Sequence, residues 1–308
     1  VVFEVGPSSG WVADLVRGMG VALQVANPSH QGWRWRNVKR KTDRIDALKL
    51  AQLSAVNQLP QVVVPQRDVR QWRAVIEYRQ RLVARRTAVK NHIRAILDRE
   101  GRTLASGKAG WTNAHREQLD ALSLPITETE ADELWRGEMA EELAYLDRIH
   151  LSIQRVERRL NALGNADPRV QLVRSVPGVG PRLGEALVAV LDDPKRFKSG
   201  KQVASYAGLT PRQYQSGNMD RHGRISGQGN ATLRALLVQA SWLGLRHNPW
   251  IREVYEHVCR GTKSRRKIAI IAVARRLLIR CWAILRDDQP WAPPPPSRPL
   301  AIAGGVGA

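Results

Sequence analysis

Three carboxylates near the start of the chain have the clearest potential for chemistry. Asp43 and Asp46 lie three residues apart where an apolar-striped helix is predicted to begin, so their side chains share one helix face. Glu4 lies in an apolar run of β-branched type, residues 1–5, which predicts the end of a buried strand. Converging carboxylates bind hard divalent cations such as Mg²⁺, which stabilise the attacking and leaving oxygens of a phosphoryl transfer. We therefore expect Glu4, Asp43 and Asp46 to lie close together and to hold metal.

The same residues also have a purely structural explanation. Asp43 is a good helix N-cap, and acidic side chains in a first turn complement the helix dipole. Glu4 weighs against this explanation, because a carboxylate among Val and Phe residues of a strand is costly to bury without a partner.

The charge of the chain points to a polyanionic partner. Lys and Arg number 49 against 28 Asp and Glu, which gives a net charge of +21 and a pI near 11.1. Ten basic residues lie in 67–100 against four acids, and nine lie in 260–286 with no acid, whereas 117–147 carries ten acids and one Arg. Two basic helices flanking an acidic segment predict nucleic-acid surfaces. The candidate cationic contacts are Arg34, Arg36, Lys41, Arg85, Arg86, Lys90, Arg221, Arg224, Arg265, Arg266 and Lys267.

Composition excludes several other classes of protein. With 308 residues and 43% hydrophobic content, the chain is predicted to be globular with two or three cores. Its two cysteines, Cys259 and Cys281, lie in apolar helical patterns, which favours a reducing cytoplasm over a disulfide framework or a zinc site. No apolar run approaches the length of a membrane span, and no signal-peptide pattern is present, so we expect a cytoplasmic protein without membrane contact.

The order of the predicted elements indicates an α/β layer followed by long helices. A strand, a helix over 10–19, a strand over 21–26 and the helix opened by Asp43 predict a mainly parallel sheet. A basic helix is predicted over 68–99. The next helix, predicted over 130–163, has nearly heptad apolar spacing, so the two can form an antiparallel or intermolecular coiled coil, or pack as a core within one chain.

A helical region with two further candidate features follows. Residues 175–180, a Pro-Gly-x-Gly turn before a helix, resemble a helix-hairpin-helix element, in which Gly178 and Gly180 offer backbone amides to a phosphate. The alternative is a glycine-rich turn between packed helices. A polar, glycine-rich loop is predicted over 212–229, and its Ser216 is a candidate nucleophile if a cation or metal assists it. Ser-Gly pairs are also ordinary turn formers. The later helices are predicted over 230–245, 249–260 and 264–286.

These motifs together resemble the DEDD transposases of the insertion-sequence one-ten family. The resemblance runs from Glu4 to about Trp282. Members of that family pair a RuvC-like, ribonuclease-H-fold domain with a helical transposase domain through a coiled coil, and they use a bridge RNA to choose DNA sites. The motifs that carry the resemblance are Glu4 before Gly-Pro, residues 41–47, residues 175–180, residues 207–211, Ser216-Gly217 and Gly229-Asn230-x-x-Leu233-Arg234.

The resemblance assigns roles residue by residue. Glu4 matches the family's glutamate, Asp43 and Asp46 its paired aspartates, and Ser216 its nucleophilic serine. The family's first aspartate has no counterpart and would lie upstream of Val1, so we expect an N-terminally truncated chain. The expected domains are a partial RuvC-like domain with the basic helix over 1–100, a coiled-coil linker over 101–168, a helical transposase domain over 169–288 and a disordered tail over 289–308.

The resemblance implies an insertion-sequence recombinase that cleaves and exchanges DNA strands with Mg²⁺ and a serine nucleophile. Its implied partners are DNA, a bridge RNA and further copies of the chain, as a dimer or tetramer held by the coiled coil. Such a protein is expected in the bacterial cytoplasm, at the nucleoid. Two alternatives stay open at this point: a metal-dependent junction nuclease without serine chemistry, and an inactive nucleic-acid-binding remnant of a transposon.

Overall fold

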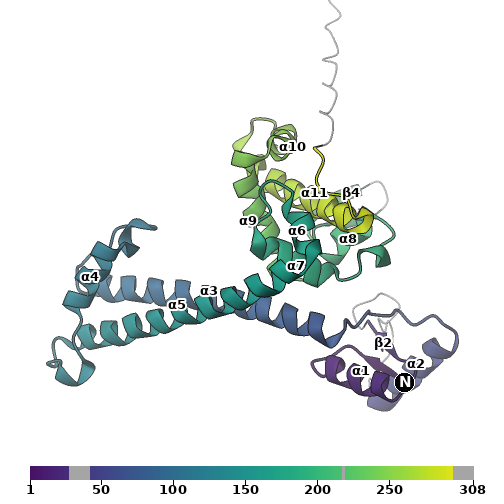
Figure 1. Cartoon of the computed structure of the whole chain (residues 1–308), viewed down its shortest axis with the longest axis horizontal. Coiled ribbons are helices and arrows are strands. Elements are labelled where there is room, and N and C mark those ends of the chain that lie inside the picture. The colour runs from purple at the N-terminus through teal and green to yellow at the C-terminus, as the bar shows by residue number, and fades with distance from the viewer. Residues whose placement is uncertain (28–41, 217–218, 294–308) are drawn as a thin grey trace, which may run out of the picture. The chain divides into compact units, whose positions relative to one another are not determined.

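The computed structural model describes residues 1–27, 42–216 and 219–293, and the side chains of 213–222 lie outside this description. The chain divides into two compact units at residues 74 and 75, inside a long helix, whereas the sequence placed the first domain boundary near residue 100. Figure 1 shows the elements of both units. Among the described residues, no helix is both long enough and apolar enough to cross a membrane.

The first unit has the predicted α/β order. Strands β1 (Val2–Glu4) and β2 (Gln24–Ala26) pair in parallel, with Glu4 opposite Ala26. Helix α1 (Ser9–Gly18) connects them, as a crossover between parallel strands requires. Gln61 forms an antiparallel bridge with Ala26 on the other side of β2. This partial sheet is compatible with an incomplete α/β domain.

Helix α2 (Asp43–Ala55) covers the sheet with a narrow apolar stripe. Leu50 and Leu53 pack with Val2, Ala26 and Leu59 in a small cluster. The Ser54 hydroxyl donates a hydrogen bond of 2.7 Å to Gln24 Oε1, which joins the helix to β2. No residue of α2 is fully buried, so this helix is held by a thin contact.

The second unit begins with a long helical pair. Helices α3 (Arg67–Arg99) and α5 (Leu134–Ala166) run side by side in opposite directions, because Arg99 pairs with Glu138 and Arg79 with Glu157 (Figure 1). The predicted apolar seam is therefore buried within one chain. Leu119, from a shorter helix, joins the same buried cluster, whose other residues are Leu82, Val89, Ile93, Ile96, Leu97, Met139, Leu143, Leu146, Ile149 and Ile153.

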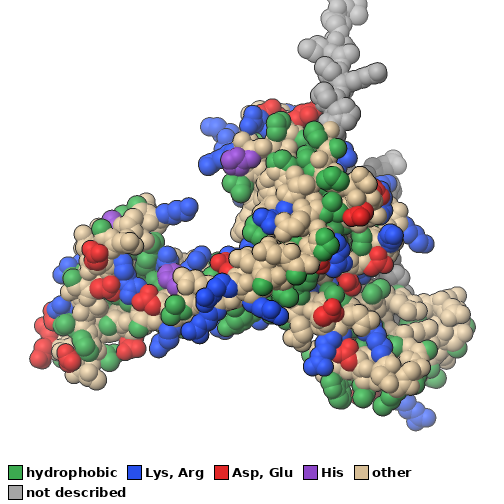
Figure 2. Space-filling model, viewed as in Figure 1, with side chains coloured by type: hydrophobic (Ala, Val, Ile, Leu, Met, Phe, Trp, Pro, Cys, Tyr) green, Lys and Arg blue, Asp and Glu red, His purple; other side chains and the backbone are tan. Residues whose placement is uncertain are grey.

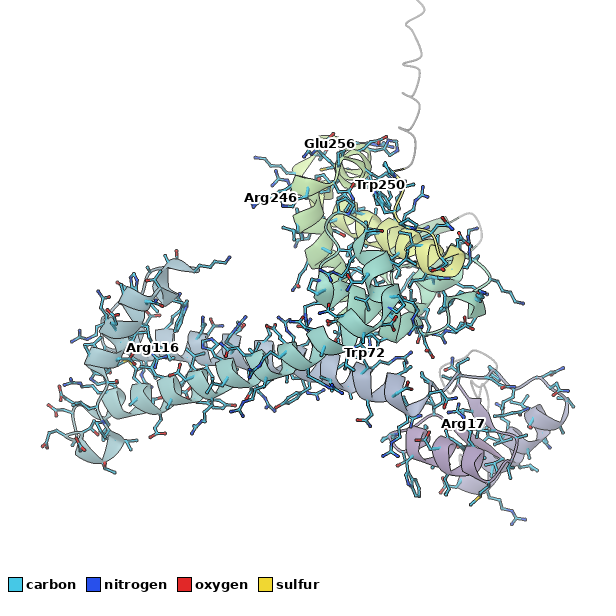
Figure 3. The ribbon with its side chains drawn as sticks, in the orientation of Figure 1. Arg17, Trp72, Arg116, Arg246, Trp250 and Glu256 are labelled. Atoms are coloured by element: carbon cyan, nitrogen blue, oxygen red, sulfur yellow. The ribbon has the colours of Figure 1, made fainter. Side chains whose placement is uncertain are left out.

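The turn between these helices has its own elements. A short 3₁₀ turn, η2 (Ala109–Trp111), and helix α4 (Asn113–Leu122) pack on the pair. Figure 3 labels Arg116 on α4, and its guanidinium holds both carboxylate oxygens of Asp147 on α5 at 2.7 and 2.8 Å.

The remaining elements form a helical domain around α11. Helix α11 contacts α6, α7, α8, α9 and α10, and its buried face includes both Leu277 and Cys281. Burial raises the pKa of the Cys281 thiol to about 12. The elements are α6 (Pro168–Arg174), α7 (Pro181–Leu191), α8 (Gly200–Tyr206), β3 (Pro211–Ser216), β4 (Met219–Ile225), α9 (Ala231–His247), α10 (Pro249–Cys259) and α11 (Arg266–Asp287).

In two segments of this domain the structure differs from what the sequence predicted. Residues 212–229, predicted as a loop, contain the antiparallel hairpin of β3 and β4. The strands are separated by two residues, Gly217 and Asn218, a spacing typical of a hairpin turn that the loop prediction overlooked. Ordered structure also continues past residue 289, because the ring of Trp291 packs on that of Trp250, and the Trp291 amide donates to Ser175 Oγ at 2.8 Å. The predicted tail beyond residue 293 lies outside the described residues.

Candidate functional site

The carboxylates of the first unit lie where β1 ends and α2 begins. Thr42, not Asp43, is the N-cap of α2, since its side chain accepts a hydrogen bond from the Ile45 amide. The structural explanation of Asp43 as the cap is therefore wrong, and its side chain is exposed in the first turn. Asp46 lies one turn further, on the face that carries Leu50, and one of its carboxylate oxygens is buried.

Glu4 is the most unusual of the three. Its Oε1 is buried, and no described residue donates a hydrogen bond to it. A buried carboxylate oxygen without a donor is unfavourable unless a cation or another donor completes it. Glu4 also follows Val2 on the same side of β1, and Val2 packs under α2. The orphaned oxygen and the carboxylate donor type fit a hard divalent cation.

The three carboxylates do not form a complete metal site by themselves. Among residues 1–27, 42–216 and 219–293, no three His, Cys, Asp or Glu side chains are gathered closely enough to hold a metal ion. Asp43 is exposed, whereas Glu4 and Asp46 each have a buried carboxylate oxygen. Glu4 and Asp46 are thus the better-placed candidates.

Ser216 occupies the last position of β3, opposite Met219 at the start of β4. The fold places this residue at the turn end of a hairpin. The stem of the hairpin is tightly fixed: Arg234 Nη1 donates to the carbonyls of Ala207, Gln228 and Gly229 at 2.8–3.1 Å. Gly208 approaches the Gln228 backbone and Gly229 the Tyr206 carbonyl so closely that a Cβ atom at either glycine would collide.

This stem unites two motifs that the sequence analysis quoted separately, residues 207–211 and 229–234. Asn230 caps α9 by accepting a hydrogen bond from the Leu233 amide. The structural role of Arg234 was not predicted, because its three acceptors come from two segments more than twenty residues apart in sequence. The motifs therefore build the support on which Ser216 is carried.

The glycine-rich turn between α6 and α7 has a packing explanation. Gly178 adopts φ +99°, and a Cβ there would lie 3.2 Å from the Gly244 Cα on α9. Asn248, which is buried, donates from Nδ2 to the Pro177 carbonyl at 3.0 Å. These contacts account for a glycine at 178 without a ligand. Gly180 is exposed at the N-terminus of α7 and stays a candidate for phosphate contact.

The candidate cations fall into three groups. Arg34, Arg36 and Lys41 lie outside the described residues, as does the side chain of Arg221. Arg85, Arg224, Arg266 and Lys267 are exposed. The third group, Arg86, Lys90 and Arg265, is half-buried. Arg265 donates from Nε to the Val258 carbonyl at 3.0 Å, so it also closes the end of α10. Figure 2 shows Lys and Arg side chains along the arm of α3 and α5, and Asp and Glu side chains gathered at its tip.

One buried carboxylate was missed altogether. Glu185 on α7 is only 1% exposed and lies against Gly164 of α5. Its Oε1 is 3.2 Å from the guanidinium of Arg182, without a hydrogen bond. Burial raises the pKa of Glu185 to about 7, although Arg182, Arg174 and Arg79 oppose the shift.

Comparison with known proteins identifies both parts of the chain. Residues 2–101 match the DEDD transposase model of IS110 elements, and residues 170–256 match the model of the transposase IS116/IS110/IS902 family. The transposase for insertion sequence element IS1111A of Coxiella burnetii is 29% identical over 303 residues, which cover 94% of this chain and 78% of that protein.

Proteins that invert pilin genes are also similar. The pilin gene-inverting protein of Moraxella bovis is 24% identical over 87% of this chain and 74% of its own length. That of Moraxella lacunata is 32% identical over 46% of this chain and 45% of its own length. With both family models matched in the expected order, the chain belongs to the IS116/IS110/IS902 family of DEDD transposases.

Proposed function

We propose that this chain cleaves and exchanges DNA strands at the ends of an insertion sequence, with divalent metal held by Glu4 and Asp46 and with Ser216 as the nucleophile. The observation that carries the metal site is the buried Glu4 Oε1, which lacks a donor among the described residues. Asp43, exposed one turn from Asp46, is available to contribute once a phosphate approaches. Bound Mg²⁺ would polarise phosphate oxygens and stabilise the leaving oxygen.

The serine role has a different support. Ser216 stands at the turn end of a hairpin whose stem is fixed by Arg234 and two closely packed glycines. A fixed stem limits the positions that residue 216 can take, which favours attack on one phosphodiester. In the attack, the serine oxygen would bond to phosphorus, its proton would pass to a base or to solvent, and the displaced sugar oxygen would leave as a new strand end.

The partners proposed are DNA and a bridge RNA, the latter because of the resemblance of the whole motif set. The net charge of +21 and the exposed cations of α3 and α11 support binding to polyanions. Assembly as a dimer or tetramer is proposed on the same resemblance alone. The apolar seam between α3 and α5 does not support it, because that seam is buried within one chain.

The serine assignment is tested by trapping a covalent protein–DNA adduct on labelled element-end DNA with guide RNA and Mg²⁺. We expect an adduct with the unaltered chain, none with Ser216→Ala, and an undiminished yield with Ser226→Ala, a matched serine just beyond β4. Cleavage that survives Ser216→Ala would instead support a nuclease that uses water.

The metal assignment is tested without turnover. A cation that binds only the folded chain stabilises it by about 1.4 kcal/mol at a tenfold excess over its dissociation constant. We expect Mg²⁺ or Mn²⁺ to raise the melting temperature of the unaltered chain, and Glu4→Gln or Asp46→Asn to abolish that rise. Glu256→Gln, which removes an exposed carboxylate of α10, is the control. A metal response that persists in both variants would place the cation elsewhere.

A further inference from the structure

A cationic pocket lies on the helical arm that α3 and α5 form. It has a volume of about 570 Å³ and lies between α3 and the turn that contains η2. Arg86, Lys90 and Arg94 come from α3, while Lys108 and Trp111 face them from the turn. No acidic residue lines it in the described part of the chain.

Arg94 builds the pocket by fixing the turn. Its guanidinium donates to the carbonyls of Leu104, Ala105 and Gly107 at 3.0–3.3 Å. Gly110 then packs so closely on the Ala105 carbonyl that a side chain there would collide. These contacts hold Trp111 across from α3, so the pocket is part of the folded structure rather than a chance hollow.

Neighbouring side chains do not neutralise the positive charge that lines the pocket. The Lys90 ammonium lies 4.5 Å from the centre of the Trp111 ring, and burial with the nearby Arg86 and Arg94 lowers the pKa of Lys90. On α5, burial and then Lys90 and Arg86 lower the pKa of His150 as well. Asp147, the acid that opposes this shift of His150, already accepts hydrogen bonds from both terminal nitrogens of Arg116. An anion is therefore the expected occupant.

The other lining groups narrow the chemistry of that anion. The Trp111 ring packs on the core of the arm, with the Lys90 ammonium and the Arg94 guanidinium over it. The ring and the aliphatic stems of the basic side chains form the apolar part of the wall, and Asn91 adds an amide that can donate and accept hydrogen bonds. A phosphate joined to an aromatic base matches both the basic side chains and the aromatic ring of the pocket, since bases pack on aromatic rings in single-strand binding sites. A volume of about 570 Å³ suits one small ligand and not a stacked base pair with its backbones.

We propose that this pocket binds one unpaired nucleotide of a nucleic-acid strand, with its phosphate against Arg86, Lys90 and Lys108 and its base against Trp111, where the base replaces the Lys90 ammonium over the ring. The inference takes from the proposed function only that the partner is nucleic acid. It adds a site that distinguishes single strands from duplex and that shares no residue with the proposed cleavage chemistry.

The test is equilibrium binding of the full chain to labelled single strands of RNA and DNA and to a duplex of equal length, without Mg²⁺. Loss of one stacked base or one phosphate contact is expected to weaken single-strand binding about tenfold. We expect that loss for Lys90→Gln and Trp111→Ala, with duplex binding changed less than about threefold. Trp111→Phe should keep most of the affinity, which separates loss of stacking from loss of folding.

Arg85→Gln is the matched comparison, because Arg85 is exposed on the same helix and outside the pocket. This substitution should weaken binding to single strands and binding to the duplex by the same small factor, about twofold. Equal losses for Lys90→Gln and Arg85→Gln on every ligand would overturn the proposal. Competition by an acidic peptide as effective as competition by the strand would also overturn it, in favour of a protein partner.

A second measurement needs no substitution. A single strand that carries 5-iodouracil is cross-linked by light to the unaltered chain, and the adduct is mapped by mass spectrometry. Adducts on Trp111 or its flanking peptide support the proposal, and adducts confined to other peptides contradict it. The RNA and DNA arms show which strand the pocket takes. Because no cleavage is measured, failure of the Ser216 chemistry would leave this result intact.

Discussion

Helices α2 and α7 are of similar length, yet their environments differ sharply. Helix α7 buries nine residues, Leu183–Leu191, whereas α2 buries none completely. The first unit also leaves Trp11, Leu48 and Val63 more than half exposed. The carboxylates proposed for metal binding therefore lie in the thinly packed unit, and the stable core lies in the other. The tightest packing and the candidate metal site are thus separated along this chain, whereas Ser216 belongs to the well-packed unit.

The largest effect should come from core truncation. Leu187 is fully buried in α7, so Leu187→Ala should lower the free energy of unfolding of the chain by about 2–5 kcal/mol. Leu50→Ala, which trims the thin stripe of α2, should cost less than about 2 kcal/mol because the side chain is only partly buried. Urea unfolding followed by circular dichroism measures both. Equal losses would remove the contrast between the units.

The next effect concerns Glu185 and pH. A carboxyl whose pKa rises to about 7 on folding favours the folded state fully only below its unfolded pKa near 4.5, and this contribution disappears as pH rises through about 7. Above pH 8 the ionised group should cost up to about 3 kcal/mol. Glu185→Gln should therefore gain stability relative to the unaltered chain at pH 8 and little at pH 4.5.

The control for this pH series is Glu256→Gln, which alters the exposed carboxylate labelled on α10 in Figure 3. It should follow the unaltered chain at every pH. If Glu185→Gln followed it too, the folded pKa of Glu185 would be close to its ordinary value.

Local opening should reveal the same contrast in the unaltered chain. Amides of α2 are expected to exchange with solvent at least tenfold faster than those of α7, because helices with few buried contacts open at low free-energy cost. Hydrogen exchange with peptide-level mass spectrometry measures this. Added Mg²⁺ should slow exchange in α2 selectively, whereas uniform protection of both helices would argue against a metal site in the first unit.

The smallest effect should come from the ion pair on the arm. The hydrogen bond to Asp147 raises the pKa of Arg116, but Asp147 is half-exposed. Asp147→Asn should change stability by less than about 1 kcal/mol, and less still at high salt. Thermal melts at two salt concentrations check this, and a loss comparable to that of Leu187→Ala would mean that the arm depends on charge more than on its apolar seam.

The sequence predicted the long helices well because their apolar spacing and capping residues are local signals. Asn230 and Asn248 cap α9 and α10 as helix-start residues should. The β3–β4 hairpin was missed since its polar strands carry no apolar alternation. Its two-residue turn was the signal available.

The candidate site divides in the same way. Asp43 and Asp46 were found from spacing, but the cap at Thr42 and the exposure of Asp43 depend on how the helix starts. The burial of Glu185 and the pocket at Trp111 could not be predicted from the sequence. They depend on contacts of Glu185 with Gly164 and of Arg94 with the turn, which exist only in the folded chain. Contacts between distant segments leave no periodic pattern in a sequence.

The fixed stem of the hairpin has a mechanical consequence. Gly208 and Gly229 press the backbones of its two ends together, and Arg234 ties three carbonyls at that point. These close contacts leave no hinge at the base about which the hairpin could rotate. Ser216 should therefore move together with the helical domain, so a large change in the position of the serine requires a movement of that whole domain.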